Sequence, residues 1–178
     1  QQFCIQQVIQ KPAIGLFLDM GLGKTAITLT AVNELKYGRF QVRRILVIAP
    51  KKVAEATWQR EAAKWDNLKH LRFSTVLGST TKRIRALNTP ADVYVINREN
   101  VVWLVDYYKN DWPFDMVVID EFSSFKSHSA KRFKALAAIR PHIRRIVGLT
   151  GTPSPNGLAD LWSQVFLLDG GKRLGRYC

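Results

Sequence analysis

Short runs of β-branched and other apolar residues alternate with longer stretches of helical periodicity along almost the whole chain. Two of these runs, ILVIA at residues 45–49 and MVVID at residues 116–120, are apolar at nearly every position. Strands that are apolar on both faces are typical of a parallel sheet that helices cover on both sides. The strict alternation of strand and helix therefore predicts a doubly wound α/β domain.

The predicted elements follow one another without a linker, an internal repeat or a low-complexity stretch. We expect strands at 14–18, 45–49, 73–77, 93–97, 116–120 and 145–149. We expect helices at 24–35, 53–65, 80–87, 99–108, 130–139 and about 158–168. A chain of 178 residues, 47% of them hydrophobic, suffices for one core, so residues 1–178 are predicted to form a single domain. Tryptophans with apolar partners at helical spacing are predicted to be core residues: Trp58, Trp65, Trp103 and Trp162.

The charge balance points to a polyanionic partner. The chain has 27 Lys and Arg residues against 14 Asp and Glu, a net charge of +13. Such an excess is typical of nucleic-acid-binding proteins, although a solvated basic surface gives the same composition. A membrane surface is disfavoured because the basic residues do not gather on one amphipathic helix. The apolar runs are also far shorter than a membrane span requires.

The two ends of the chain bear on the expected compartment. The N-terminus, QQFCIQQVIQKP, lacks the basic segment and apolar stretch of a signal peptide. Cys4 and Cys178 show no CxxC spacing and fit a reducing compartment. We therefore expect a cytoplasmic protein that is not secreted.

The first predicted strand leads directly into DMGLGKT at residues 19–25, and a helical pattern follows. In this context the glycines let backbone N–H groups surround phosphate oxygens, and the helix N-terminus adds positive potential. Lys24 would contact the terminal phosphates, and the Thr25 hydroxyl would bind Mg²⁺. The general GxxxxGK[ST] pattern has glycine at the position of Leu18, so a chance match remains the alternative. The predicted phosphate-binding residues are Met20, Gly21, Leu22, Gly23, Lys24 and Thr25.

A second motif consists of two adjacent carboxylates, Asp120 and Glu121, at the end of a buried strand. The carboxyl ends of parallel strands meet at one edge of a sheet, so Asp120 can lie beside the phosphate-binding loop. Asp120 would then hold Mg²⁺, and Glu121 would orient and deprotonate an attacking water. A solubilising sheet edge is the alternative interpretation.

A third motif, LTGTP at residues 149–153, follows the last predicted strand. With the other two motifs it resembles the first RecA-like lobe of superfamily-two helicases. The segments DMGLGKT, ILVIAPKKVAEATWQREAAKW, VIDEFSSFK and GLTGTPSPNGLADLW resemble more closely the Swi/Snf-type DNA translocases, in the short form found in phages and bacteria. The resemblance implies a RecA-like P-loop NTPase domain with a mainly parallel sheet.

The resemblance also implies roles for further residues. Gln1 or Gln2 stands where the family has a glutamine that reads adenine. Two segments match stretches that contact a DNA backbone: Pro50, Lys51 and Lys52 with Trp58, and then Asn97 with Arg98. The third motif, Thr150, Gly151 and Thr152, matches residues that couple the nucleotide state to the DNA contact.

These implications lead to one expected function and two alternatives. The chain would be the ATP-binding lobe of a translocase that couples Mg²⁺-ATP hydrolysis to movement on duplex DNA. An RNA-directed or strand-separating helicase lobe, or a basic nucleic-acid-binding module that uses no nucleotide, are the alternatives. The residues after Thr152 are too few for a second RecA-like lobe, so we expect that lobe to be absent from this chain. Alone, this lobe is expected to be almost inactive.

Overall fold

The computed structural model describes residues 1–17, 23–121 and 130–151. These residues form one sheet in the order β1-β6-β5-β2-β4-β3, and each pairing between the described strands is parallel. The predicted α/β class with a mainly parallel sheet is therefore confirmed. The strands are β1 (Ala13–Phe17), β2 (Ile45–Ala49), β3 (Phe73–Val76), β4 (Val93–Asn97), β5 (Met116–Asp120) and β6 (Arg145–Thr150).

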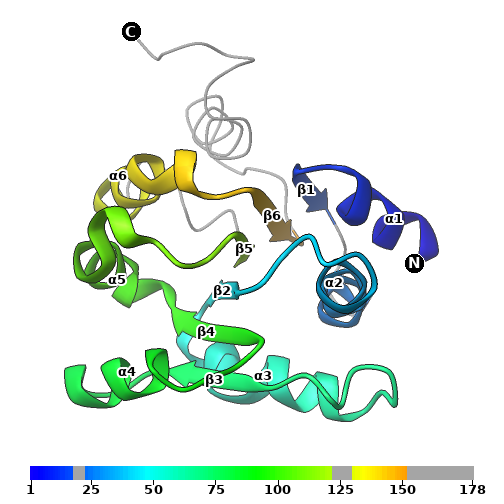
Figure 1. Ribbon diagram of the computed structural model, residues 1–178, viewed down its shortest axis with the longest axis horizontal. Coiled ribbons are helices and arrows are strands. Elements are labelled where there is room, and N and C mark those ends of the chain that lie inside the picture. Colours follow the sequence, from blue (N-terminus) through cyan, green and yellow to red (C-terminus); the bar gives the residue numbers. More distant parts are fainter. Residues whose placement is uncertain (18–22, 122–129, 152–178) are drawn as a thin grey trace, which may run out of the picture.

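Helices cover both faces of this sheet (Figure 1). One face packs against α1 (Gln2–Gln10), α2 (Lys24–Asn33) and α3 (Lys51–Ala63). The other face packs against α4 (Thr80–Leu87), α5 (Val101–Tyr108) and α6 (Ala130–Ile139). Short helical turns extend three of these helices or lead into α5: η1 (Glu34–Gly38), η2 (Arg98–Asn100), η3 (Lys109–Asp111) and η6 (Arg140–His142).

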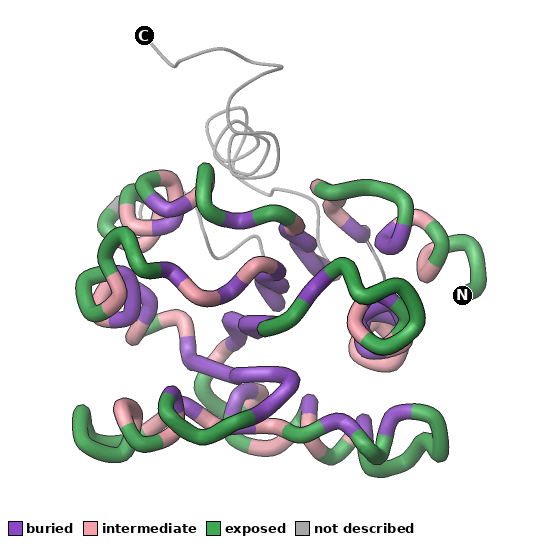
Figure 2. The backbone as a smooth tube through the Cα atoms, in the orientation of Figure 1, coloured by how far each residue is buried: buried purple, intermediate pink, exposed green. Residues whose placement is uncertain are grey.

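Alternate residues of the central strands enter the two halves of the core. In β2, Ile45, Val47 and Ala49 pack with α1, α2 and α3, whereas Leu46 and Ile48 pack on the opposite face. All five residues are almost fully buried, so β2 contributes to both core layers. The buried part of the chain runs through the strands in Figure 2, as the two-sided apolar pattern predicts.

Helix α1 is missing from the predicted elements. It has no side-chain hydrogen bond at its N-terminus, and it buries Val8 and Ile9 against the rest of the fold. The Arg145 guanidinium, at the start of β6, donates hydrogen bonds to the carbonyl oxygens of Val8 (3.3 Å) and Ile9 (2.9 Å). Tertiary contacts rather than local signals therefore hold this helix in place.

The tryptophan predictions fare differently. Trp58 is fully buried on α3, which confirms its predicted place in the core. The prediction for Trp65 is wrong: α3 ends at Ala63, and Trp65 lies in the following turn with 49% of its surface exposed. Trp103 is half-buried on α5. Trp162 and the helix predicted at about 158–168 lie outside the described residues.

The parallel topology collects several polar segments at the edge where the strands end. Asp120 ends β5, Thr150 ends β6 and Asn97 ends β4, while Pro50 directly follows β2. Helix α2 also begins at this edge, after Gly23. None of the described helices is long and apolar enough to cross a membrane.

Candidate functional site

The centre of the site is an ion cluster at the N-terminus of α2. The Lys24 side-chain nitrogen lies 3.1 Å from Oδ1 of Asp120 and 3.0 Å from Oε1 of Glu121. Asp120 is 3% exposed, whereas 38% of the Glu121 side chain is open to solvent. The cluster therefore has one carboxylate enclosed in the protein and one that solvent can reach.

Electrostatics hold Lys24 in its charged form. Burial lowers the pKa of Lys24, but the charges and hydrogen bonds of Asp120 and Glu121 outweigh that effect, and the pKa rises above its ordinary 10.5. The ammonium group is therefore protonated throughout the physiological range. A positive charge is fixed where the helix N-terminus already favours anions.

Two residues at this site, Gly23 and Glu121, have a positive φ angle. Gly23 precedes α2 with φ 71°, a left-handed conformation that glycine adopts without a steric cost. Glu121 has φ 55°, which is rare for a residue with a side chain and costs about 1–3 kcal/mol. In this conformation the Glu121 backbone N–H donates a 3.0 Å hydrogen bond to Oδ1 of Asp120. Backbone strain thus accompanies the placement of the two carboxylates.

The buried side of Asp120 is bound by an aromatic donor. The indole Nε1–H of Trp58 donates to Oδ2 of Asp120 at 3.2 Å, and the two residues are 62 positions apart in the chain. Trp58 was expected to be a core residue in a segment that contacts DNA. Its complete burial excludes direct contact between its side chain and a nucleic acid in this conformation.

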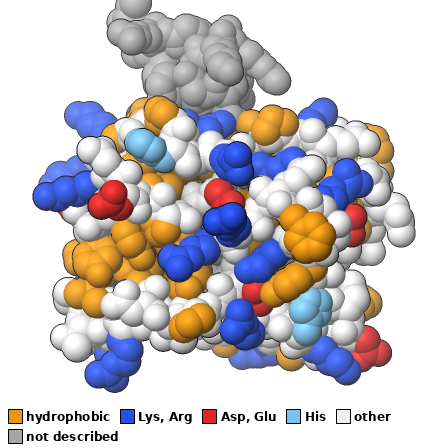
Figure 3. All heavy atoms as spheres, in the orientation of Figure 1, with side chains coloured by type: hydrophobic (Ala, Val, Ile, Leu, Met, Phe, Trp, Pro, Cys, Tyr) orange, Lys and Arg blue, Asp and Glu red, His pale blue; other side chains and the backbone are white. Residues whose placement is uncertain are grey.

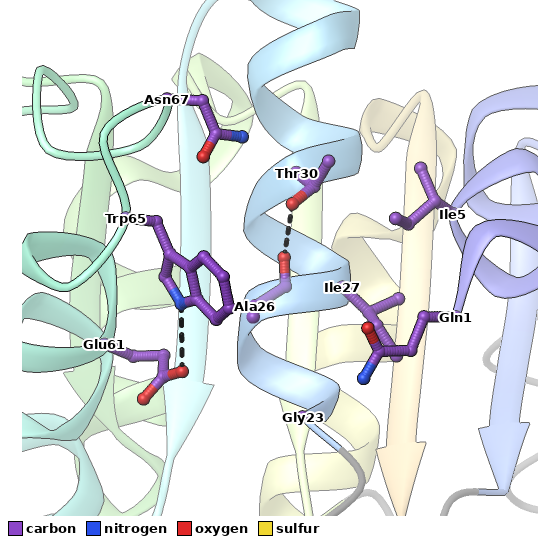
Figure 4. Close-up of a pocket in the computed structure, with 9 residues that line it drawn as sticks. All are labelled: Gln1, Ile5, Gly23, Ala26, Ile27, Thr30, Glu61, Trp65 and Asn67. Atoms are coloured by element: carbon purple, nitrogen blue, oxygen red, sulfur yellow. Dashed lines mark hydrogen bonds between the residues drawn. The ribbon is translucent and has the colours of Figure 1, made fainter.

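A pocket of about 310 Å³ lies along the exposed side of α2. Figure 4 shows Gln1 and Ile5 on one side of this helix and Glu61, Trp65 and Asn67 on the other. The Trp65 indole donates a 3.2 Å hydrogen bond to Glu61, which orients the ring at the pocket wall. The sequence pattern missed Trp65 as a pocket residue because it predicted a core position for this side chain.

Among the described residues that line this pocket is Gln1, one of the two glutamines predicted to read adenine. Its Nε2 lies 3.6 Å from the point that a Cβ at Gly23 would occupy. The N-terminal residue and Gly23 of the phosphate-binding motif are therefore close together, although 22 positions separate them in the chain. Gln2 is exposed at the start of α1.

The remaining predicted nucleotide residues are placed only in part. Thr25 is half-buried in the first turn of α2, beside Lys24. Thr150 is 2% exposed at the end of β6, and Gly151 follows it. Met20, Gly21, Leu22 and Thr152 lie outside the described residues.

The two predicted nucleic-acid segments are neighbours. Strands β2 and β4 pair directly, and Ala49 lies opposite Asn97. The exposed residues Lys51 and Lys52 form the first turn of α3 after Pro50. The strand pairing therefore brings this basic turn close to Arg98.

The Asn97 side chain forms hydrogen bonds within its own turn. Its side chain donates to Glu99 at 3.0 Å and accepts a 2.7 Å hydrogen bond from Asn100, and the residue is 6% exposed. Burial raises the pKa of Glu99, but its own backbone N–H, Asn97 and Arg98 outweigh burial and lower it. Asn97 therefore shapes the turn that carries Arg98.

The donor set at this edge fits a magnesium ion. Asp120, Glu121 and the Thr25 hydroxyl supply oxygen atoms, which are the ligands that Mg²⁺ prefers. The Lys24 ammonium lies between the two carboxylates, so a cation is already accommodated there. Among the described residues no group of three or more His, Cys, Asp or Glu side chains could enclose a metal ion. The arrangement suits an ion that keeps water and phosphate ligands.

The chain is similar to a well-defined set of proteins. The sequence model of the SNF2-related domain family matches residues 4–172. Protein p41 of Acyrthosiphon pisum secondary endosymbiont phage 1 is 43% identical over 99% of this chain. The mouse DNA excision repair protein ERCC-6-like is 33% identical over 82% of it.

A solved structure is similar as well. The SWI2/SNF2 ATPase core of Sulfolobus solfataricus, in complex with double-stranded DNA, matches 96% of this chain with a TM-score of 0.75 and 27% identity. The chain spans 34% of that protein, 40% of the phage relative and 12% of the mouse relative. The similarity thus extends over one part of each longer protein.

Proposed function

This chain belongs to the SNF2-related domain family, and we propose that it is the ATP-binding lobe of a DNA-dependent ATPase that moves along duplex DNA. The observation that carries the proposal is the contact of Lys24 with both Asp120 and Glu121 at the N-terminus of α2. These are the groups that phosphoryl transfer to water requires: a cation for the phosphates, a metal-binding carboxylate and a base.

Each residue has a distinct task in the proposed reaction. Lys24 binds the terminal phosphates, and a bound Mg²⁺, held by Thr25 and Asp120, would neutralise charge on them. Glu121 is the more exposed carboxylate, so it orients the attacking water and accepts its proton. Gln1 and Trp65 line the pocket that would receive the adenine base.

The nucleic-acid part of the proposal concerns the turn at Lys51 and Lys52, together with Arg98. The similarity to an ATPase core bound to double-stranded DNA supports duplex DNA as the partner. The alternative is an RNA-directed or strand-separating helicase lobe. In a polypeptide that also contains a second lobe, ATPase stimulation by duplex DNA favours the first interpretation, and stimulation by single-stranded RNA favours the second.

Isothermal titration with ADP and Mg²⁺ tests the nucleotide site. Lys24→Ala should weaken binding roughly 10- to 100-fold, because hydrogen bonds to charged groups contribute about 1.5–3 kcal/mol. Lys82→Ala is the matched control, since Lys82 is exposed on α4. Equal affinities for wild type and Lys24→Ala would contradict the proposal and favour a basic module that uses no nucleotide.

A further inference from the structure

The contact between Trp58 and Asp120 joins two parts of the site that have separate proposed tasks. Trp58 belongs to α3, whose first turn carries Lys51 and Lys52. Asp120 ends β5 and is the proposed metal-binding carboxylate. The hydrogen bond from the indole Nε1–H to Oδ2 is 3.2 Å long and lies in the buried core.

The hydrogen bonds of Asp120 divide between its two oxygens. Oδ2 accepts from Trp58, which lies on the buried side. Oδ1 accepts from the Glu121 backbone N–H at 3.0 Å and contacts the Lys24 ammonium at 3.1 Å. The indole therefore holds one oxygen in the core and leaves the other directed toward Lys24. Partial rotation of the carboxylate would break the buried bond and leave the indole N–H without an acceptor.

Helix α3 can transmit a displacement to this bond. Ala54, Trp58 and Ala62 follow one another at intervals of four residues, so they share one face of the helix, and all three are buried. Trp58 lies seven residues, or about 10 Å along the helix axis, from Lys51. Since a packed helix moves as a unit, a shift of its basic first turn also shifts the indole.

We propose that Trp58 is a positioning residue that fixes the orientation of the Asp120 carboxylate, and that through α3 it links contact with duplex DNA to metal affinity at the nucleotide site. This inference rests on the proposed function, because it requires a metal-nucleotide complex at Asp120. The inference goes beyond the proposed function in two respects. Trp58 affects the site without contacting the nucleotide, and α3 is the element through which DNA would alter metal affinity.

The test must separate the N–H donor from the bulk of the side chain. Trp58 fills the core between α3 and the sheet, so Trp58→Ala would remove a large buried ring and destabilise the fold. Replacement of Trp58 by β-(3-benzothienyl)alanine keeps the shape of the ring and substitutes sulfur for the N–H group. The same replacement at Trp103, which is half-buried on α5, is the matched control.

The first measurement is ADP affinity by titration calorimetry, with and without Mg²⁺. Partners of metal ligands typically change metal affinity 10- to 100-fold, so the gain in ADP affinity from Mg²⁺ should fall by about 10-fold in the Trp58 variant. ADP affinity without Mg²⁺ and the Trp103 control should match wild type, whereas the melting temperature of the Trp58 variant should fall because the buried Oδ2 of Asp120 loses its donor. An unchanged gain from Mg²⁺ would overturn the inference and leave the proposed function intact. Wild-type protein that binds no ADP would contradict both.

The second measurement adds a short duplex DNA. DNA should change the Mg²⁺-ADP affinity of the wild-type protein by a measurable factor that differs from one. By linkage, Mg²⁺-ADP should change DNA affinity by the same factor. In the Trp58 variant this factor should be close to one, while DNA affinity without nucleotide stays at the wild-type value. A wild-type factor of one, or an equal factor in both proteins, would overturn the proposed link.

Discussion

The side-chain nitrogen of Lys24 lies 3.0 Å from Oε1 of Glu121, although 97 residues separate them along the chain. The proposed phosphate-binding cation is therefore paired with the proposed base. Nucleotide phosphates would compete with Glu121 for the ammonium group, because Lys24 has to turn toward them. Release of that pair would leave Glu121 free to accept a proton, which links base activation to nucleotide binding.

Trp65 should report nucleotide binding directly. Its indole is 49% exposed and lines the pocket with Gln1, so an adenine base in that pocket would cover it. We expect ADP to change the fluorescence of the wild-type protein and to change that of Trp65→Phe much less. Trp65→Ala should weaken ADP binding about 5- to 160-fold, given about 1–3 kcal/mol for stacking of a base on an aromatic ring.

Trp103→Phe is the control for this experiment. Trp103 stacks on Tyr107 at a centroid distance of 5.3 Å and lies on α5, on the other face of the sheet. Its removal should leave the ADP-dependent signal in place. A signal that disappears with Trp103 and persists without Trp65 would show that the base binds elsewhere.

Sequence patterns predicted the sheet well because β2 and β5 are apolar on both faces. This property can be seen in the sequence of a single strand, without knowledge of the strands beside it. Helix α1 was missed because no capping side chain marks its start and because Arg145, which binds its C-terminal end, comes from β6. Ile5, Val8 and Ile9 do follow helical spacing. A search for this spacing could have found the helix.

The contacts of the site were likewise predicted only in part. Parallel topology was enough to expect Asp120 near Lys24, since strand ends share one sheet edge. The contact of Trp58 with Asp120 depends on how α3 packs over β2 and β4, beside the end of β5, and no local pattern encodes it. Trp65 was misplaced for a smaller reason: α3 ends two residues before the apolar spacing does, and the ring turns toward solvent.

The buried charge of Asp92 should make stability depend on pH. Asp92 is 0% exposed and accepts hydrogen bonds from the Arg72 backbone N–H at 2.7 Å and from Tyr37, while Lys36 lies 2.8 Å away. Burial raises the pKa of Asp92, but these partners outweigh burial and hold it below its ordinary 3.8. A lowered pKa stabilises the fold above pH 3.8, and that contribution is lost as the pH falls through the folded-state pKa.

Urea denaturation of Asp92→Asn checks this expectation. At pH 7 the variant should unfold with a free energy about 3 kcal/mol lower, because Lys36 loses a buried counter-charge. The difference from wild type should shrink as the pH falls below 3.8. Asp66→Asn is the control, since its side chain is 98% exposed and should change little at either pH. A difference that is constant from pH 7 to acid would show that charge at Asp92 is not the cause.

DNA binding should depend on where the positive charge lies. Lys51 and Lys52 follow β2, whereas Arg43 and Arg44 precede the same strand, and all four are exposed. Figure 3 shows Lys and Arg side chains spread among hydrophobic ones, so net charge alone could attract DNA. We expect reversal to Glu at Lys51 and Lys52 to reduce duplex affinity more than reversal at Arg43 and Arg44.

The measurement is fluorescence anisotropy of labelled duplex DNA at several salt concentrations. Removal of two phosphate contacts should lower the slope of log affinity against log salt by about 1.8. Affinity should be insensitive to DNA sequence, because phosphate contacts carry no base information. Equal losses for the two double reversals would mean that overall charge, not the turn after β2, binds DNA.

The last prediction concerns turnover and a second lobe. The chain spans 40% of the phage relative's length, and we propose that a second α/β lobe completes the ATP site. An arginine supplied across such a site accelerates phosphoryl transfer about 10³- to 10⁵-fold, so residues 1–178 alone should hydrolyse ATP barely above background. Addition of the second lobe in the same polypeptide should restore DNA-stimulated phosphate release, and Glu121→Gln should abolish it without weakening ADP binding. Rapid DNA-stimulated hydrolysis by residues 1–178 alone, removed by Glu121→Gln, would show that this lobe contains a complete catalytic site.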